Sequence, residues 1–216
     1  MRDAPVHPAL AVDLGCGPGA TTALVHSTTG ATRTIGVDSS AGFLDQARAA
    51  VHDAEFLLAD LTDAPVPPAD LVYARYLLSH LPAPEDRIHA WRATLRPGGR
   101  LLVEENTRLR ISHPVFRRYE DAVAVVMGTA GGDLYVGERL VPLADRVTRA
   151  TVAPPASVIA RLFGMNLQTW RSHPAAADVD VEALAEDLRS LETVEERGLV
   201  RFDLAQLVFW AATASA

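Results

Sequence analysis

The sequence predicts an α/β protein whose parallel β-sheet is covered by helices on both faces. Short apolar runs with the character of strands alternate with segments that repeat apolar residues at helical spacing. The first run leads into a glycine-rich turn, Gly15-Cys-Gly17-Pro-Gly19, and three successive runs carry an acid at or near their ends. Because parallel strands bring their carboxyl ends to one edge, we expect the turn and the acids to form one ligand site there.

The glycine turn follows a strand that includes Val12. Glycine has no Cβ, so it adopts positive φ easily and lets a ligand approach the backbone, and the helix that follows offers unpaired N–H groups. Gly15, Gly17 and Ala20 also satisfy the dinucleotide pattern G-x-G-x-x-G/A. The turn alone therefore leaves a nicotinamide or flavin enzyme open, and the elements that follow must decide.

The remaining strands are predicted at residues 33–38, 54–61, 69–74, 100–105, 148–153 and 201–211. Asp38 ends the second strand about 20 residues beyond the turn, where a carboxylate accepts hydrogen bonds from ribose hydroxyls. Asp60 stands near the end of the third, and the turn Pro97-Gly98-Gly99 precedes the fifth. Helical spacing of apolar residues predicts helices after Ser39-Ser40 and over residues 85–95, 113–130, 157–166 and 181–191.

One set of motifs carries a resemblance: Asp13-x-Gly15-x-Gly17-x-Gly19, Asp38, Asp60-Leu61, Ala69-Asp-Leu-Val and Leu95-Arg-Pro-Gly-Gly99. This set, within residues 10–106, resembles the class I S-adenosylmethionine-dependent methyltransferases. It is similar more narrowly to the small-molecule group that includes trans-aconitate methyltransferases and many enzymes of natural-product biosynthesis. The resemblance implies a Rossmann-like, doubly wound, mostly parallel seven-stranded sheet with an antiparallel last strand. It also implies a single methyltransferase domain over residues 1–216, with residues 107–142 as a helical substrate lid after strand five.

The resemblance implies S-adenosyl-L-methionine as the cofactor and assigns its binding residues one by one. Asp13 would lie near the methionine amino group or brace the loop, and Gly15, Gly17 and Gly19 would let the backbone approach the methionine and ribose. Asp38, with Ser39 beside it, would hold the ribose hydroxyls. Asp60 and Leu61 would bind the adenine, and Arg75 would lie near the methionine end. No metal is implied.

Charge and composition limit the partners. The net charge is −7, the isoelectric point is near 5.5 and all 20 basic residues are arginine, which argues against nucleic acid as a substrate. Cys16 has no second cysteine for a disulfide, and the apolar run 207–212 is far shorter than the roughly 20 residues that cross a membrane. We therefore expect a cytoplasmic monomer or homodimer that binds neither nucleic acid nor membrane.

The expected chemistry is in-line displacement at the sulfonium methyl, with a small-molecule acceptor that attacks through oxygen. A carboxylate acceptor needs no base, whereas a hydroxyl must lose its proton, typically to a histidine or a carboxylate. The candidates are His80, His113 and Glu105. Tyr119 and Tyr135 are candidates for packing over an aromatic acceptor.

Four arginines, at positions 108, 110, 117 and 118, bracket the expected lid. They form either a solvated face or, where one or two turn inward, a site for an acidic acceptor.

Two alternatives to a methyltransferase stay open. An NAD(P)-dependent oxidoreductase is disfavoured because the chain lacks the lysine of the common Tyr-x-x-x-Lys set, and a catalytically degenerate partner protein with the same fold is the other.

Overall fold

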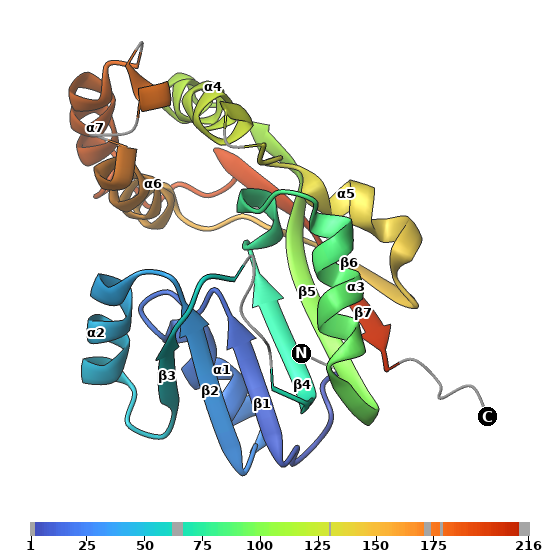
Figure 1. The fold of residues 1–216 in the computed structure, drawn as a ribbon. Coiled ribbons are helices and arrows are strands. Elements are labelled where there is room, and N and C mark those ends of the chain that lie inside the picture. Colours follow the sequence, from blue (N-terminus) through green and yellow to red (C-terminus); the bar gives the residue numbers. More distant parts are fainter. Residues whose placement is uncertain (1–2, 62–66, 130, 171–173, 178, 212–216) are drawn as a thin grey trace.

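A computed structural model describes residues 3–61, 67–129, 131–170, 174–177 and 179–211. Its centre is a seven-stranded sheet of order β3-β2-β1-β4-β5-β7-β6 (Figure 1). The strands are β1 (Leu10–Leu14), β2 (Arg33–Asp38), β3 (Glu55–Leu58), β4 (Ala69–Arg75), β5 (Leu95–Ile111), β6 (Arg146–Val152) and β7 (Val200–Trp210). The first five are parallel, and β7 lies antiparallel between β5 and β6. The expected sheet with an antiparallel last strand is confirmed.

Helices cover the sheet on both faces. They are α1 (Ala20–Thr29), α2 (Ala41–Ala50), α3 (Pro84–Ala93), α4 (Pro114–Thr129), α5 (Val136–Leu140), α6 (Ala156–Trp170) and α7 (Val181–Ser190), with short 3-10 turns η1 (Leu78–His80), η2 (Val141–Leu143) and η3 (Pro174–Ala176). Alternation along β1 divides the core, because successive side chains of a strand point to opposite faces. Val12 packs in the cluster that contains Trp91 of α3 and Leu140 of α5, and Ala11 packs in the cluster that contains Val25 of α1.

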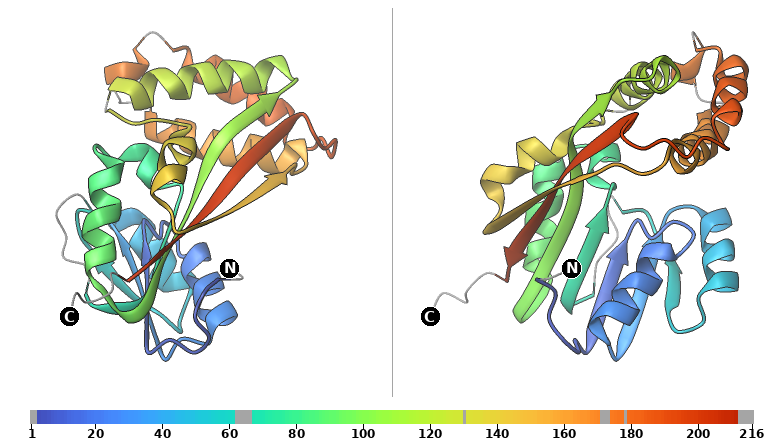
Figure 2. Two further views of the ribbon diagram at one scale, coloured as in Figure 1. Left: turned by 90° about the vertical axis from the view of Figure 1, so that its right-hand side faces the viewer. Right: turned by 180° about the vertical axis from the view of Figure 1, so that it is seen from behind.

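A third apolar cluster lies beyond the carboxyl ends of the parallel strands. It joins α4, α6, α7 and η3, which we call the helical cap, to the far ends of β5 and β7. Figure 2 shows the cap held away from the sheet by these two long strands. Within it the rings of Tyr119 and Phe163 stack with centroids 3.8 Å apart, and Trp170 stacks on Tyr119 at 5.3 Å. The cap therefore has a well-packed aromatic centre.

Strand five is much longer than the predicted 100–105. It pairs with β7 from Arg100 opposite Trp210 to Ile111 opposite Val200, which draws its polar residues into the sheet. The predicted lid segment thus begins inside β5, and α4 and α5 occupy most of the rest. The expected helix at 113–130 corresponds to α4, with residue 130 outside the described residues, and strand three is shorter than expected, at 55–58.

A β-bulge interrupts β5, where the pairing shifts between Asn106 and Arg108. The inserted residue is Thr107, so Thr107 and Arg108 face the same side of the strand. Beyond the bulge, Leu109 and Ile111 face the cavity under the helical cap. The bulge therefore sets which β5 side chains face the cap.

Candidate active site

The glycine turn forms the floor of the site. Gly15, Gly17 and Gly19 have φ of 68°, 52° and 89°, values that favour glycine. The N–H groups of Gly15 and Cys16 both donate to the carbonyl of Val37, which ties the turn to β2. A Cβ placed on Gly15 would lie 2.9 Å from Leu77, whereas one on Gly17 meets no protein atom within 4 Å. Open space therefore faces Gly17, where a ligand can approach the turn.

Asp38 links the turn to the next helix. Its Oδ2 accepts from the N–H of Gly17 at 2.9 Å, and its Oδ1 accepts from the N–H of Ser40 at 2.8 Å. Ser40 in turn caps α2 through the N–H of Phe43. A carboxylate oxygen has two lone pairs, so each oxygen of Asp38 keeps acceptor capacity for a ligand hydroxyl. Ser39, the next residue, is exposed.

Asp13 is buried at the end of β1, with only 1% of its surface exposed. The hydroxyl of Thr22 donates to its Oδ2 at 2.7 Å. Burial raises the pKa of Asp13 to about 7, against the opposing effect of the threonine hydrogen bonds. Without any ligand, the carboxyl group of Asp13 therefore braces the start of α1 through Thr22.

The remaining predicted cofactor residues lie past the ends of β3 and β4. Asp60 is exposed, and Leu61 is buried in the cluster beneath α3. Arg75 pairs with Glu104, with Nε and Oε2 3.3 Å apart, and its guanidinium lies over the ring of Tyr76. The sheet thus brings all the predicted cofactor residues to one edge.

A cavity of about 400 Å³ runs from the glycine turn to the helical cap. Gly15 and Pro18 line its end at the turn, and the rest is lined by residues of α2, η1, β5, α4, α6 and β7, together with Tyr76 and Leu134. Most of the lining is apolar or aromatic. The polar side chains, apart from two tyrosines, are Ser79, His80, Asn106, Glu120 and Asn166.

Of the three predicted bases, His80 lines this cavity and the other two do not. Much of the His80 side chain is exposed, but protein atoms around its ring exclude water, and this desolvation lowers its pKa. His113 instead lies at the start of α4, where its Nδ1 accepts from the N–H of Val115 at 3.3 Å and its ring lies 5.5 Å from that of Phe116. It acts there as a helix-entry residue.

Glu105 is fully buried behind the η1 segment. Its Oε1 accepts from the N–H of Leu78 at 2.8 Å, and its Oε2 has no hydrogen-bond partner. Burial raises the pKa of Glu105 to about 7, although hydrogen bonds from η1 oppose the shift. Its position holds the segment that carries Ser79 and His80 to the cavity.

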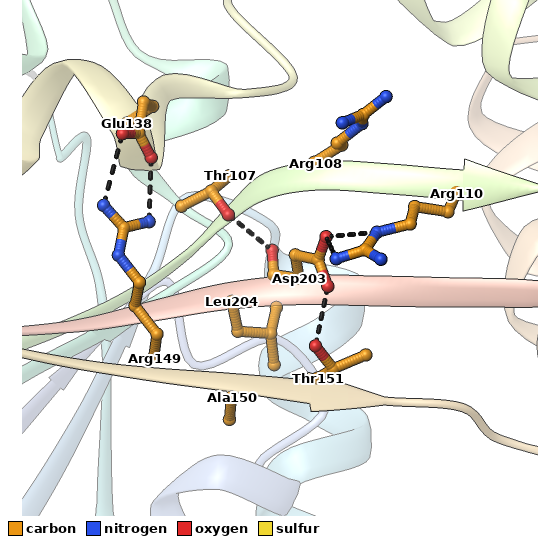
Figure 3. Close-up of a pocket in the computed structure, with 9 residues that line it drawn as sticks. All are labelled: Thr107, Arg108, Arg110, Glu138, Arg149, Ala150, Thr151, Asp203 and Leu204. Carbon is orange, nitrogen blue, oxygen red and sulfur yellow. Dashed lines mark hydrogen bonds and ion pairs between the residues drawn. The ribbon is translucent and has the colours of Figure 1, made fainter.

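None of the four arginines that bracket the predicted lid lines the cavity. Figure 3 shows Arg108 and Arg110 in a separate pocket beside β5 and β7, where Arg110 pairs with Asp203 and Arg149 with Glu138. Arg117 donates to the carbonyl of Ile111, and Arg118 pairs with Asp187 of α7. Their solvated-face interpretation fits these positions.

The sequence did not predict that the residues lining this cavity would lie together. The predicted apolar face of α4 includes Tyr119 and Val123, and the same face lines the cavity, so helical periodicity was a usable signal. Glu120 accepts a hydrogen bond from the hydroxyl of Tyr135. The contribution of α6, including Asn166, had no sequence signal, because it depends on how α6 packs against α4.

Within the described residues, no helix combines the length and apolar character that a membrane crossing requires. The same residues contain no group of three or more histidine, cysteine or acidic side chains placed to hold a metal ion.

Comparison with known proteins identifies relatives. Residues 11–99 match the family model described as a methyltransferase domain. The trans-aconitate 2-methyltransferase of Methylobacterium radiotolerans is 31% identical over 185 residues, which cover 85% of this chain and 68% of that protein. That of Azoarcus sp. is 42% identical over 97 residues, or 44% of this chain and 38% of that protein, so this match spans less than half of either. A crystal structure from Bacillus halodurans shares the fold, with a TM-score of 0.61 and 13% identity over 98% of this chain and 95% of that one.

Proposed function

Because the chain belongs to the class I S-adenosylmethionine-dependent methyltransferases, we propose that it transfers a methyl group from this cofactor to an oxygen atom of a small molecule. One observation carries the proposal: the cavity under the helical cap opens directly onto the glycine turn. Cofactor and acceptor would therefore meet in one enclosed space. The helices of residues 107–142 and α6 would cover the acceptor.

The residues of the turn fit the cofactor. The open space at Gly17 accommodates a ligand against the backbone, and Asp38 has acceptor capacity for both ribose hydroxyls. Asp60 and Leu61 would hold the adenine at the end of β3, and Arg75 would border the methionine end. Asp13 would brace the turn through Thr22. Of the two roles that the sequence left open for Asp13, this is the bracing role and not contact with the methionine amino group.

S-adenosylmethionine supplies a methyl group on a sulfonium ion, and transfer leaves the bonding pair on sulfur as S-adenosylhomocysteine. The protein contributes alignment and a cavity with little water. For a hydroxyl acceptor, His80 would take the proton as the new carbon–oxygen bond forms. Its lowered pKa favours the neutral, proton-accepting imidazole at neutral pH.

The first test is calorimetric titration of the purified protein with S-adenosylhomocysteine, with NAD and NADP as comparators. We expect micromolar binding of S-adenosylhomocysteine alone, followed by labelled-methyl transfer in an acceptor screen. Binding of the nicotinamide nucleotides alone would instead support an oxidoreductase. Binding of none of the three would favour a degenerate partner protein.

Asp38→Ala tests the placement of the cofactor. It removes two hydrogen bonds to a charged acceptor, each worth about 1.5 kcal/mol, so affinity should fall about 100-fold. Asp53→Ala is the matched control, because Asp53 is an exposed acid that precedes β3 and lies away from the turn. Equal affinity of the two variants would show that the ribose acid has been misplaced.

A further inference from the structure

We infer that the acceptor is a neutral, ring-bearing hydroxyl compound, because the cavity combines an acidic Glu120 with an apolar aromatic wall and has no arginine among its described lining residues. The inference rests on the proposed function and narrows its acceptor from hydroxyl or carboxylate to hydroxyl. It also separates this chain from the relatives described above, whose names give a tricarboxylate, trans-aconitate, as the acceptor.

The charges around the cavity disfavour a carboxylate ligand. Proteins usually bind carboxylates with arginine or with several N–H donors, because an anion that leaves water without such partners is strongly destabilised. Among the described lining residues there is no arginine, and the side chains that can carry a charge, tyrosines aside, are His80 and Glu120. A tricarboxylate would bring three negative charges beside Glu120 and find at most one cation.

The nearby arginines are directed elsewhere by the bulge in β5. Arg108 and Arg110 lie on the face shown in Figure 3, whereas Leu109 and Ile111 face the cavity. Arg75, the arginine next to the η1 segment, is paired with Glu104. None of these three arginines is among the residues that line the cavity.

Glu120 favours a polar group that donates a hydrogen bond. It lines the cavity and accepts from the hydroxyl of Tyr135, which leaves further acceptor capacity on its two carboxyl oxygens. A hydroxyl donates a hydrogen bond to such a group, and an ionised carboxylate does not.

The wall opposite suits a flat ring. Tyr119 and Phe163 are stacked, and Asn166 donates to the hydroxyl of Tyr119 at 2.9 Å, which holds that ring in place. Aromatic side chains offer large, rigid surfaces that favour stacked or edge-on contact with other rings. Met127 and Met165 border the same space and adapt to ligand shape.

The test uses protein saturated with S-adenosylhomocysteine and three probes: 2-naphthol, 2-naphthoate and trans-aconitate. The first two share a ring system and differ in the polar group, so their ratio isolates the effect of charge and donor. We expect calorimetry to show 2-naphthol binding at least tenfold more tightly than 2-naphthoate, with no saturable binding of trans-aconitate. Saturation with S-adenosylhomocysteine is measured first, so a failure of the proposed function is recorded separately.

One variant tests the charge of the cavity. Glu120→Gln should narrow the gap between the naphthol and naphthoate affinities. Arg110→Ala is the control and should change neither affinity, because Arg110 pairs with Asp203 and lines the other pocket. Tight binding of trans-aconitate, or equal binding of the two naphthyl compounds, would overturn the inference. Failure of 2-naphthol to bind the cofactor-loaded protein would overturn it as well.

Discussion

Glu105→Gln should make the stability of the protein less dependent on pH. The carboxyl is fully buried, one oxygen accepts the Leu78 N–H and the other has no partner. Burial raises its pKa to about 7 from the ordinary value of 4.5. Glutamine keeps a carbonyl for the Leu78 N–H but carries no ionisable proton, so it removes the titration while retaining that hydrogen bond.

The sign follows from the two pKa values. Below pH 4.5 the folded and unfolded chains both carry the proton, so the shift has no effect on stability. Between the two values the unfolded chain loses its proton while the folded chain keeps it, so the free energy of unfolding falls by about 1.4 kcal/mol per pH unit. From pH 5 to pH 8 the wild type should therefore lose about 2.5 kcal/mol relative to Glu105→Gln.

Urea unfolding of both proteins at several pH values between 5 and 8 measures this difference. The pKa of Asp13 is also raised, but Asp13 titrates in both proteins and its contribution cancels. Glu138→Gln is the control, because Glu138 is exposed and Arg149 lowers its pKa, so its replacement should give no gain at high pH. A constant difference between wild type and Glu105→Gln across the range would refute the reasoning.

Three further outcomes are expected. For a hydroxyl acceptor, kcat/KM should be constant near neutral pH and fall at lower pH as His80 gains a proton, with a midpoint below the usual histidine pKa of about 6.5. His80→Gln should abolish this decrease at low pH. Gly15→Ala should destabilise the protein and weaken S-adenosylhomocysteine binding, since φ is 68° and Leu77 blocks the new methyl group, whereas Gly164→Ala inside α6 should raise the free energy of unfolding by about 0.5–1 kcal/mol. Arg118→Ala breaks an exposed ion pair and should cost less than about 1 kcal/mol in chemical denaturation; a larger loss would mean that this pair anchors α4 to α7.

The sheet and the glycine turn were predictable because their signals are local. The predicted second strand, 33–38, agrees with β2 at both ends, and the helix after Ser40 begins where that serine caps it. The ends of β5 were not predictable, because Asn106, Thr107 and Arg108 have weak strand character and join the sheet by pairing with β7. That pairing links residues nearly half the chain apart.

The site divides in the same way. The turn and its acids could be placed at one sheet edge from their positions at strand ends, although their roles toward the cofactor stay predictions. The cavity could not, because Tyr119 and Phe163 meet only when α4 and α6 pack together. The orientation of Glu105 likewise depends on where η1 lies, which no local pattern records.

The bulge at Thr107 sets the character of the cavity wall through strand register. Side chains alternate along a strand, so if Thr107 paired with β7 as an ordinary strand residue, Arg108 and Arg110 would turn to the cap side and Leu109 and Ile111 would face outward. The same sequence would then present a pair of cations in place of an apolar surface. The choice between a neutral and an anionic ligand can thus rest on one unpaired residue, while the glycine turn stays unchanged.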